Sequence, residues 1–185
     1  MNDRTQPTAG RALEIREARP EEYGVLGAIT VAAYRGLDAS SDANASSNLS
    51  DHYLVQLRDV ADRAAKAVVL AALDPEPLGC VTYVPGLGEY AEFEDADAAG
   101  IRMLAVAPAA RSKGAGRALT QGCLERARAD GFRLVVLHTM ASAVSARHLY
   151  ETMGFVRAPD RDWYPEPDIF LMGYEYPLHA PAPLP

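Results

Sequence analysis

The pattern of apolar and polar positions predicts a series of strands across the chain. Residues 12–19 alternate between apolar and polar side chains, as a half-buried strand does. Residues 67–73 and 78–85 are apolar runs joined by Asp-Pro-Glu-Pro, which predicts a hairpin. Similar runs predict further strands over 101–108, 132–140 and 168–178, with a short strand near 154–158.

Helical periodicity fills most of the intervals between these strands. Pro20, followed by two glutamates, is typical of a helix start, and apolar residues at helical spacing continue to residue 34. Helices are also predicted over 50–67, 116–131 and 142–155. The small polar residues of 36–50 predict a loop.

This order of elements predicts an α/β fold with a mixed, partly antiparallel central sheet and helices on both faces. The strands at 101–108 and 132–140 are joined by a helix, so we expect them to pair in parallel. The second of them is almost continuously apolar, which is typical of a strand covered on both faces. We predict one domain over residues 11–178, between a flexible segment 1–10 and a flexible Pro-rich tail 179–185.

Composition narrows the possible functions. The 185 residues suit a single domain with a full core. A net charge of −7 argues against a general nucleic-acid binder and is compatible with a cationic partner. The N-terminal segment is polar and no apolar run is long enough for a membrane span, so we expect a cytoplasmic protein without membrane contact. Cys80 and Cys123 lie in apolar segments without metal-ligand spacing, which predicts buried thiols and no metal.

The segment 107–119 carries the most specific chemical signal. Gly114 and Gly116 stand between a strand that ends at Pro108 and a predicted helix, and three cations surround them. The free backbone amides of a helix N-terminus attract an anion, for which a pyrophosphate is the natural candidate. An ordinary glycine turn with solvated cations is the alternative. The dinucleotide fingerprint and the P-loop do not match, because Leu119 replaces a third glycine and Gly-Lys-Ser/Thr is absent.

Two motifs together resemble the GCN5-related N-acetyltransferases (GNAT). Residues 104–119, LAVAPAARSKGAGRAL, resemble the acetyl-coenzyme A (acetyl-CoA) motif Arg/Gln-x-x-Gly-x-Gly/Ala, and residues 149–155, LYETMGF, resemble the second signature of the family. The order of elements also matches over most of residues 12–177. The resemblance implies the GNAT (acyl-CoA N-acyltransferase) fold. It also implies an acyltransferase that moves acetyl from its co-substrate acetyl-CoA to a primary amine of a small molecule or peptide, by direct attack in a ternary complex.

The resemblance also implies roles for individual residues. The strand before the loop pairs with the pantetheine arm, and the loop holds the pyrophosphate. The matching positions are Leu104, Ala105, Val106, Arg111, Ser112, Lys113, Gly114, Ala115, Gly116 and Arg117. Tyr150 matches the tyrosine that many members use as general acid, although its place on an apolar helical stripe also fits a core aromatic.

Three positions depart from the family pattern. Ser112 replaces a frequent glycine, Ala143 replaces a frequent asparagine, and Gly100 stands where many members carry a glutamate. The last two departures favour an alternative function, a non-catalytic acyl-CoA-binding sensor or interaction module. In an active enzyme, Gly100 leaves the proton acceptor to be supplied from elsewhere.

The acidic segment 89–97 is the candidate source of that base. The candidate bases in it are Glu92, Glu94, Asp95 and Asp97, and a water relay or a merely solvated loop are alternatives. We predict Glu94 and Asp97, with Tyr150, as the catalytic residues. His138, near the end of a strand, could act as base or line the acceptor site, or be a structural histidine.

The acceptor itself is not named by any motif. The acidic segment would attract a cationic amine. We expect specificity to come from residues 34–56 and 161–170, where Trp163 and Tyr164 could form an aromatic wall. These side chains could equally pack on the last strand or on a second copy of the chain in a homodimer.

Overall fold

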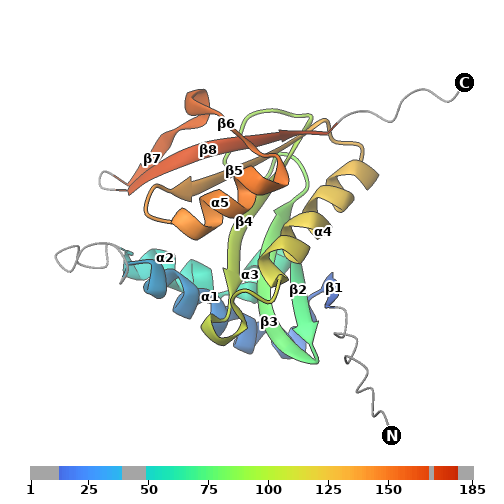
Figure 1. The fold of residues 1–185 in the computed structure, drawn as a ribbon, viewed down its shortest axis with the longest axis vertical. Coiled ribbons are helices and arrows are strands. Elements are labelled where there is room, and N and C mark those ends of the chain that lie inside the picture. The colour runs from blue at the N-terminus through green and yellow to red at the C-terminus, as the bar shows by residue number, and fades with distance from the viewer. Residues whose placement is uncertain (1–12, 39–48, 167–168, 179–185) are drawn as a thin grey trace, which may run out of the picture.

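The computed structural model describes residues 13–38, 49–166 and 169–178 (Figure 1). The predicted flexible segments 1–10 and 179–185 lie outside this range, so their flexibility stays a prediction. The elements are β1 (Glu14–Glu17), η1 (Pro20–Glu22), α1 (Tyr23–Asp38), α2 (Asp51–Arg58), α3 (Val60–Lys66), β2 (Val68–Asp74), β3 (Glu76–Val84), β4 (Ala98–Val106), η2 (Pro108–Ala110), α4 (Ala115–Ala129), β5 (Leu134–Met140), α5 (Val144–Met153), β6 (Val156–Arg157), η3 (Pro159–Arg161), β7 (Trp163–Glu166) and β8 (Ile169–Pro177).

The strands form one mixed sheet in the order β1-β2-β3-β4-β5-β8-β6, with β7 also paired to β8 (Figure 1). The single parallel pair of this sheet is β4 with β5, as predicted, and the other pairs are antiparallel. Ala98 to Ile101 of β4 are in register with Leu134 to Leu137 of β5. The parallel pair therefore lies at the centre of the sheet, between two antiparallel parts.

Helices cover both faces of the sheet, which confirms the predicted architecture. Successive residues of β2 show this, because a strand points alternate side chains to opposite faces. Leu70 and Ala72 pack in the core cluster that contains buried residues of α4 and α5. Val69 and Ala71 pack in a second cluster, with residues of α1 and α3. The two faces explain why β2 is apolar without alternation.

Two elements differ from the sequence prediction. The helix predicted over 50–67 is two helices, because the Asp59 side chain accepts a hydrogen bond from the Asp62 amide and caps α3. The strand β7 was not predicted, since Pro165 interrupts its pattern. It forms a hairpin with β8 by pairing Glu166 with Ile169.

The remaining expectations concern cysteines and membrane spans. Cys80 and Cys123 are both buried free thiols, as predicted. Within the described ranges, every helix is too short or too polar to cross a membrane.

Candidate functional site

The two central strands separate where β4 bulges. Two residues of β3, Cys80 and Thr82, face Ala105 and Arg102 of β4, so β4 carries one extra residue at this point. Met103 in the bulge has a φ of 53°, a left-handed value that is rare outside glycine. A bulge bends and twists its strand. Among the described residues, the edge of β4 that faces β5 therefore has no strand partner beyond Ile101.

The three residues predicted to pair with pantetheine lie on this free part of β4. Leu104 and Val106 are half-buried, whereas Ala105 is buried and in register with Cys80 of β3. Leu104 also lines the large cavity described below. The strand thus has one edge held by the sheet and one edge whose amides and carbonyls are available to a ligand.

The predicted pyrophosphate loop leads directly into α4. Gly114 is the N-cap with a φ of 84°, which favours glycine, and Ser112 has a φ of 64°. No side chain in the described part of the chain caps this helix. The first-turn amides of Ala115, Gly116 and Arg117 are thus left to an outside acceptor, and the helix dipole adds partial positive charge. This arrangement fits a bound phosphate group.

The three cations of the loop do not all point to the same place. Arg111 reaches across to α1, because a Cβ built on Gly36 would lie 3.4 Å from its Nη2 atom. Arg117 donates a hydrogen bond to the Thr152 hydroxyl of α5, at 2.9 Å. Lys113 is exposed on the loop. An anion bound here would therefore contact backbone amides more than a cluster of guanidinium groups.

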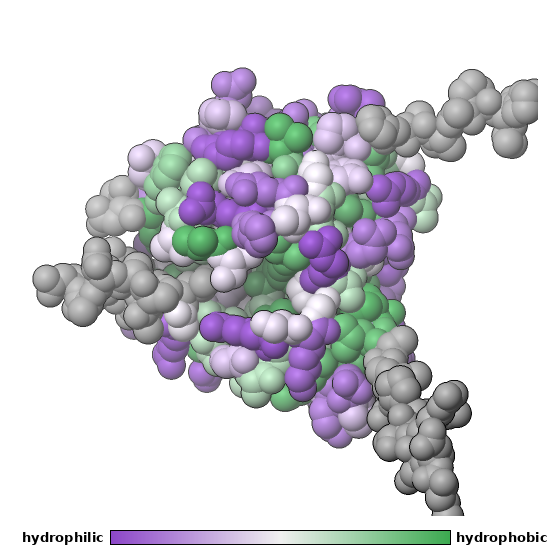
Figure 2. All heavy atoms as spheres, in the orientation of Figure 1, coloured by the Kyte–Doolittle hydropathy of each residue, from purple (hydrophilic) through white to green (hydrophobic). Residues whose placement is uncertain are grey.

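Gly116 also has a packing role that the sequence did not indicate. A Cβ at this position would lie 3.4 Å from Leu149 of α5 and 3.7 Å from Val106 of β4. The first turn of α4 thus sits close to both neighbouring elements. Figure 2 shows the hollow on this face, between α5 and the N-terminal end of α4.

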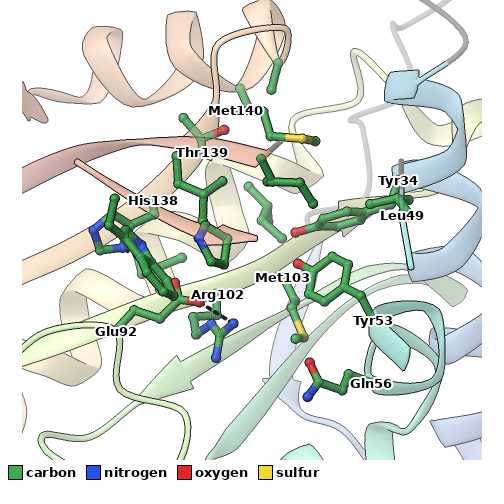
Figure 3. A pocket seen from close by; sticks show the side chains of 18 of the residues that line it. Tyr34, Leu49, Tyr53, Gln56, Glu92, Arg102, Met103, His138, Thr139 and Met140 are labelled. Carbon is green, nitrogen blue, oxygen red and sulfur yellow. Dashed lines mark ion pairs between the residues drawn. The ribbon is translucent and has the colours of Figure 1, made fainter. Parts of the chain in front are cut away.

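A cavity of about 370 Å³ continues from the gap between β4 and β5 into the protein. Leu104, Thr139 and Tyr150 line it on the side of the separated strands. Tyr53 of α2 also lines it (Figure 3), as does Trp163 of β7, which packs on the His138 ring of β5. The cavity therefore receives residues from both segments predicted to determine specificity, except for 39–48, which lie outside the described residues.

Tyr150 lies where both of its predicted roles are compatible. Its side chain is 5% exposed and packs against Phe155, with ring centroids 5.6 Å apart. It belongs to the main core cluster and also lines the cavity. Burial raises the pKa of the Tyr150 phenol, so the group stays protonated at neutral pH and can donate a proton.

The two carboxylates predicted to be catalytic, Glu94 and Asp97, do not line this cavity. Asp97 is at the N-terminal end of β4 and pairs with Arg133 at 2.7 Å. Glu94 is exposed and borders a second cavity. Asp95 binds Arg161 through both oxygens, at 2.6 and 3.2 Å, and these hydrogen bonds lower the pKa of Asp95. The structure therefore separates these three residues from Tyr150.

Glu92 is the carboxylate of this predicted group that lines the cavity. It forms an ion pair with Arg102 of β4, and its other oxygen lies 3.5 Å from Nδ1 of His138 (Figure 3). Arg102 also stacks over the Tyr90 ring, 5.6 Å from its centroid. Arg102 was not predicted as a site residue. The signal in the sequence is a single charge inside the apolar run of β4.

Two tyrosines of the cavity lie in the predicted specificity segment 34–56 but were not singled out as site residues. Tyr34 of α1 and Tyr53 of α2 meet edge to face, with ring centroids 6.1 Å apart, and Figure 3 shows their hydroxyl groups converging. Burial raises the pKa of both phenols. Their helical spacing resembles that of core residues, so the sequence offers little to distinguish them.

The packing around Gly100 leaves no room for a larger side chain. A Cβ at this position would lie 2.7 Å from the Phe93 ring and 3.3 Å from the Val84 Cβ. Phe93 thus already fills the space that a side chain at position 100 would need.

In the described ranges, no group of three or more His, Cys, Asp or Glu side chains is placed to hold a metal ion.

Comparisons with known proteins agree with this geometry. A model of the acetyltransferase (GNAT) family matches residues 32–155. An acetyltransferase of the GNAT family from Staphylococcus aureus Mu50 is 14% identical, with a TM-score of 0.69 over 91% of this chain and 100% of that chain. No curated protein matches.

Two further similar structures contain the coenzyme. The yncA protein of Salmonella typhimurium, solved with its cofactor acetyl-CoA, is 19% identical, with a TM-score of 0.61 over 93% of this chain and 97% of that chain. The PaiA N-acetyltransferase of Thermoplasma acidophilum, solved with coenzyme A, is 15% identical, with a TM-score of 0.65 over 90% of this chain and 100% of that chain. At these identities the likeness shows a shared fold.

Proposed function

Because this chain belongs to the GNAT family of acetyltransferases, we propose that it transfers acetyl from acetyl-CoA to a primary amine of a small molecule or peptide, by direct attack in a ternary complex. One observation carries the proposal: a single cavity connects the unpaired edge of β4 with Tyr150 and with the aromatic rings of Tyr53 and Trp163. The thioester and an acceptor can therefore meet inside the protein without a covalent enzyme intermediate.

Each part of the site has a role in this reaction. The amides of the first turn of α4 bind the pyrophosphate of acetyl-CoA, and the free edge of β4 pairs with its pantetheine arm. The amine binds among the residues from α2 and β7 that line the cavity, which include Tyr53 and Trp163. Its nitrogen attacks the thioester carbonyl, and the Tyr150 hydroxyl protonates the departing thiolate. A phenol is protonated at neutral pH, and Tyr150 lines the cavity in which the thiolate would form.

The acceptor proposed here is an amine with a positive charge. The carboxylates of Glu89, Glu92 and Glu166 line the cavity. Lys66 pairs with Glu89 and Arg102 pairs with Glu92, so the carboxylates outnumber these cations by one. An excess of carboxylates attracts a cation and raises its local concentration. Aromatic rings at Tyr53 and Trp163 add surfaces on which a cation can rest.

The test measures thiol release from acetyl-CoA against a panel of amines that includes spermidine, lysine amide and an N-terminal peptide. The double variant Arg111→Ala with Gly114→Val removes a loop cation and the left-handed N-cap. It should lose the thermal shift that coenzyme A produces, whereas the matched control Arg126→Ala, at the far end of α4, should keep it. An unchanged shift in the double variant would contradict the proposed coenzyme site.

The sensor alternative predicts a different result in the same assay. A coenzyme A thermal shift without turnover on any amine would favour a non-catalytic binding module. The departure at Gly100 does not by itself support that alternative, because Phe93 fills the space and Glu92 supplies a carboxylate to the cavity instead.

A further inference from the structure

Three side chains form a wall between two cavities. The first is the acceptor cavity next to Tyr150, and the second has a volume of about 450 Å³. Glu92, His138 and Trp163 line both, so they stand between the reacting groups and the second cavity. A group in this position can exchange protons with either side.

The hydrogen bonds of His138 determine which of its nitrogens is free. Its side chain is 3% exposed, and its Nε2 lies 2.9 Å from the backbone carbonyl oxygen of Arg161. A carbonyl oxygen can only accept, so Nε2 carries the hydrogen and donates it. In the neutral ring, Nδ1 is therefore an unprotonated acceptor. The Trp163 ring meets the imidazole edge to face, with centroids 6.2 Å apart, and limits its rotation.

Glu92 is placed to stabilise a proton on that free nitrogen. Its Oε2 atom lies 3.5 Å from Nδ1 of His138, and its Oε1 atom pairs with Arg102. When Nδ1 gains a proton, the imidazolium has two donors and two acceptors, namely the Arg161 carbonyl and the Glu92 carboxylate. Each N–H of the imidazolium thus faces an acceptor.

Charged and polar groups from several elements surround the His138 ring. Glu92 approaches from the loop before β4, Arg102 from β4, and the carbonyl of Arg161 from η3. Asp162 and Arg157 form a neighbouring ion pair at 2.5 Å, and Asp95 neutralises the Arg161 guanidinium. Cations and carboxylates near His138 are therefore largely balanced, and Glu92 is the carboxylate that faces Nδ1.

Resting on the proposed function, we propose that His138 and Glu92 form the proton-accepting pair of the reaction and that the proton leaves through the second cavity. An acceptor that arrives as an ammonium ion first loses one proton to Nδ1 of His138. Its free electron pair then forms the C–N bond, the C–S bond breaks, and the thiolate takes a proton from Tyr150. The acetylated nitrogen then loses its second proton, which passes through the cavity to the Tyr150 phenolate and restores the phenol. The products are the N-acetyl amine, coenzyme A thiol and the proton released from His138.

The second cavity suits the release of that proton. It is lined on its outer side by the exposed carboxylates of Glu94 and Asp160. Carboxylates at the surface exchange protons with bulk water and favour the passage of positive charge. Acetyl-CoA would occupy the opening between β4 and β5, so the second cavity remains a route to solvent during the reaction.

The test compares His138→Gln and Glu92→Gln with the matched controls His148→Gln and Glu125→Gln, which are exposed on α5 and α4. Turnover of acetyl-CoA is measured from about pH 6.5 to pH 10 on the most active amine of spermidine, lysine amide and a peptide N-terminus. Each of the two site variants should lose about 100-fold in kcat/KM near neutral pH. The loss should shrink at high pH, where the amine is already neutral, and coenzyme A binding should not change.

A second measurement does not depend on the acceptor. Nitrogen NMR of protein labelled in histidine should show His138 as the Nε2–H tautomer in its neutral form. An Nδ1–H tautomer, or a loss of activity that is equal at every pH, would overturn the proton-accepting pair while leaving acetyl transfer intact. Absence of turnover on every amine would instead overturn the proposed function and this inference with it.

Discussion

Replacement of Gly100 by alanine tests whether contact with Phe93 and Val84 excludes a side chain at position 100, where many family members carry a glutamate. The new Cβ would lie 2.7 Å from Cε1 of Phe93 and 3.3 Å from the Cβ of Val84, whereas carbon atoms prefer about 3.5–4.0 Å. Overpacking of this kind costs about 1–3 kcal/mol. Alanine recovers about 0.5–1 kcal/mol over glycine within a strand. We therefore expect a net loss of about 1–2 kcal/mol in the free energy of unfolding.

Urea unfolding followed by circular dichroism measures this loss. With a slope of about 2 kcal/mol/M, the midpoint should fall by about 0.5–1 M. In a Phe93→Ala background the obstructing ring is absent, so the same change should cost at least about 1 kcal/mol less. Gly88→Ala is the matched control, because a Cβ there meets no atom within 4 Å. An equal cost of Gly100→Ala with and without the Phe93 ring would refute this reasoning.

Three further changes probe the acid, the loop and an ion pair. Tyr150→Phe should reduce turnover by about 100-fold without changing the coenzyme A thermal shift, and near-normal turnover would exclude this acid. Ser112→Gly should raise the free energy of unfolding by about 0.5–1 kcal/mol, because relief of the left-handed backbone exceeds the added chain entropy of glycine; a lower urea midpoint would contradict this. Glu22 pairs with Arg16, whose hydrogen bonds lower the pKa of Glu22 from 4.5 to about 2. The ion pair therefore stabilises the fold above about pH 4.5, and this stabilisation is lost as pH falls toward 2. In urea unfolding, Glu22→Gln should cost about 1 kcal/mol at neutral pH and nothing near pH 2; a cost that is the same at both pH values would contradict this.

The parts of the fold that follow from local pattern could be predicted. The strand ending at Pro108, the glycine turn and the helix to Gly131 are specified by residues near one another in sequence. Their arrangement as a parallel crossover then follows from general topology. The break at Asp59 could not be found in the same way, because the apolar periodicity continues across it and one side-chain hydrogen bond decides the outcome.

The segment proposed to bind coenzyme A could be located for the same reason, because the glycine loop is one continuous segment, whereas the groups on the acceptor side could not. The proposed proton-accepting pair instead joins Glu92 from a loop to His138 from β5, and Arg102 from β4 binds Glu92. Only the register of the sheet brings these residues together. Within the acidic segment 89–97, composition gave no means of separating Glu92 from Glu94 and Asp97.

Acetyl transfer by direct attack is tested most directly by following both products of a single turnover. The protein is mixed with acetyl-CoA, first alone and then with the most active amine, and the reaction is stopped over time. Mass spectrometry then measures free coenzyme A, N-acetyl amine and intact protein together. We predict equal amounts of coenzyme A and N-acetyl amine, formed only when the amine is present, and no acetylated protein. Thiol release without N-acetyl amine, or an acetyl-protein that precedes the product, would contradict the proposed reaction.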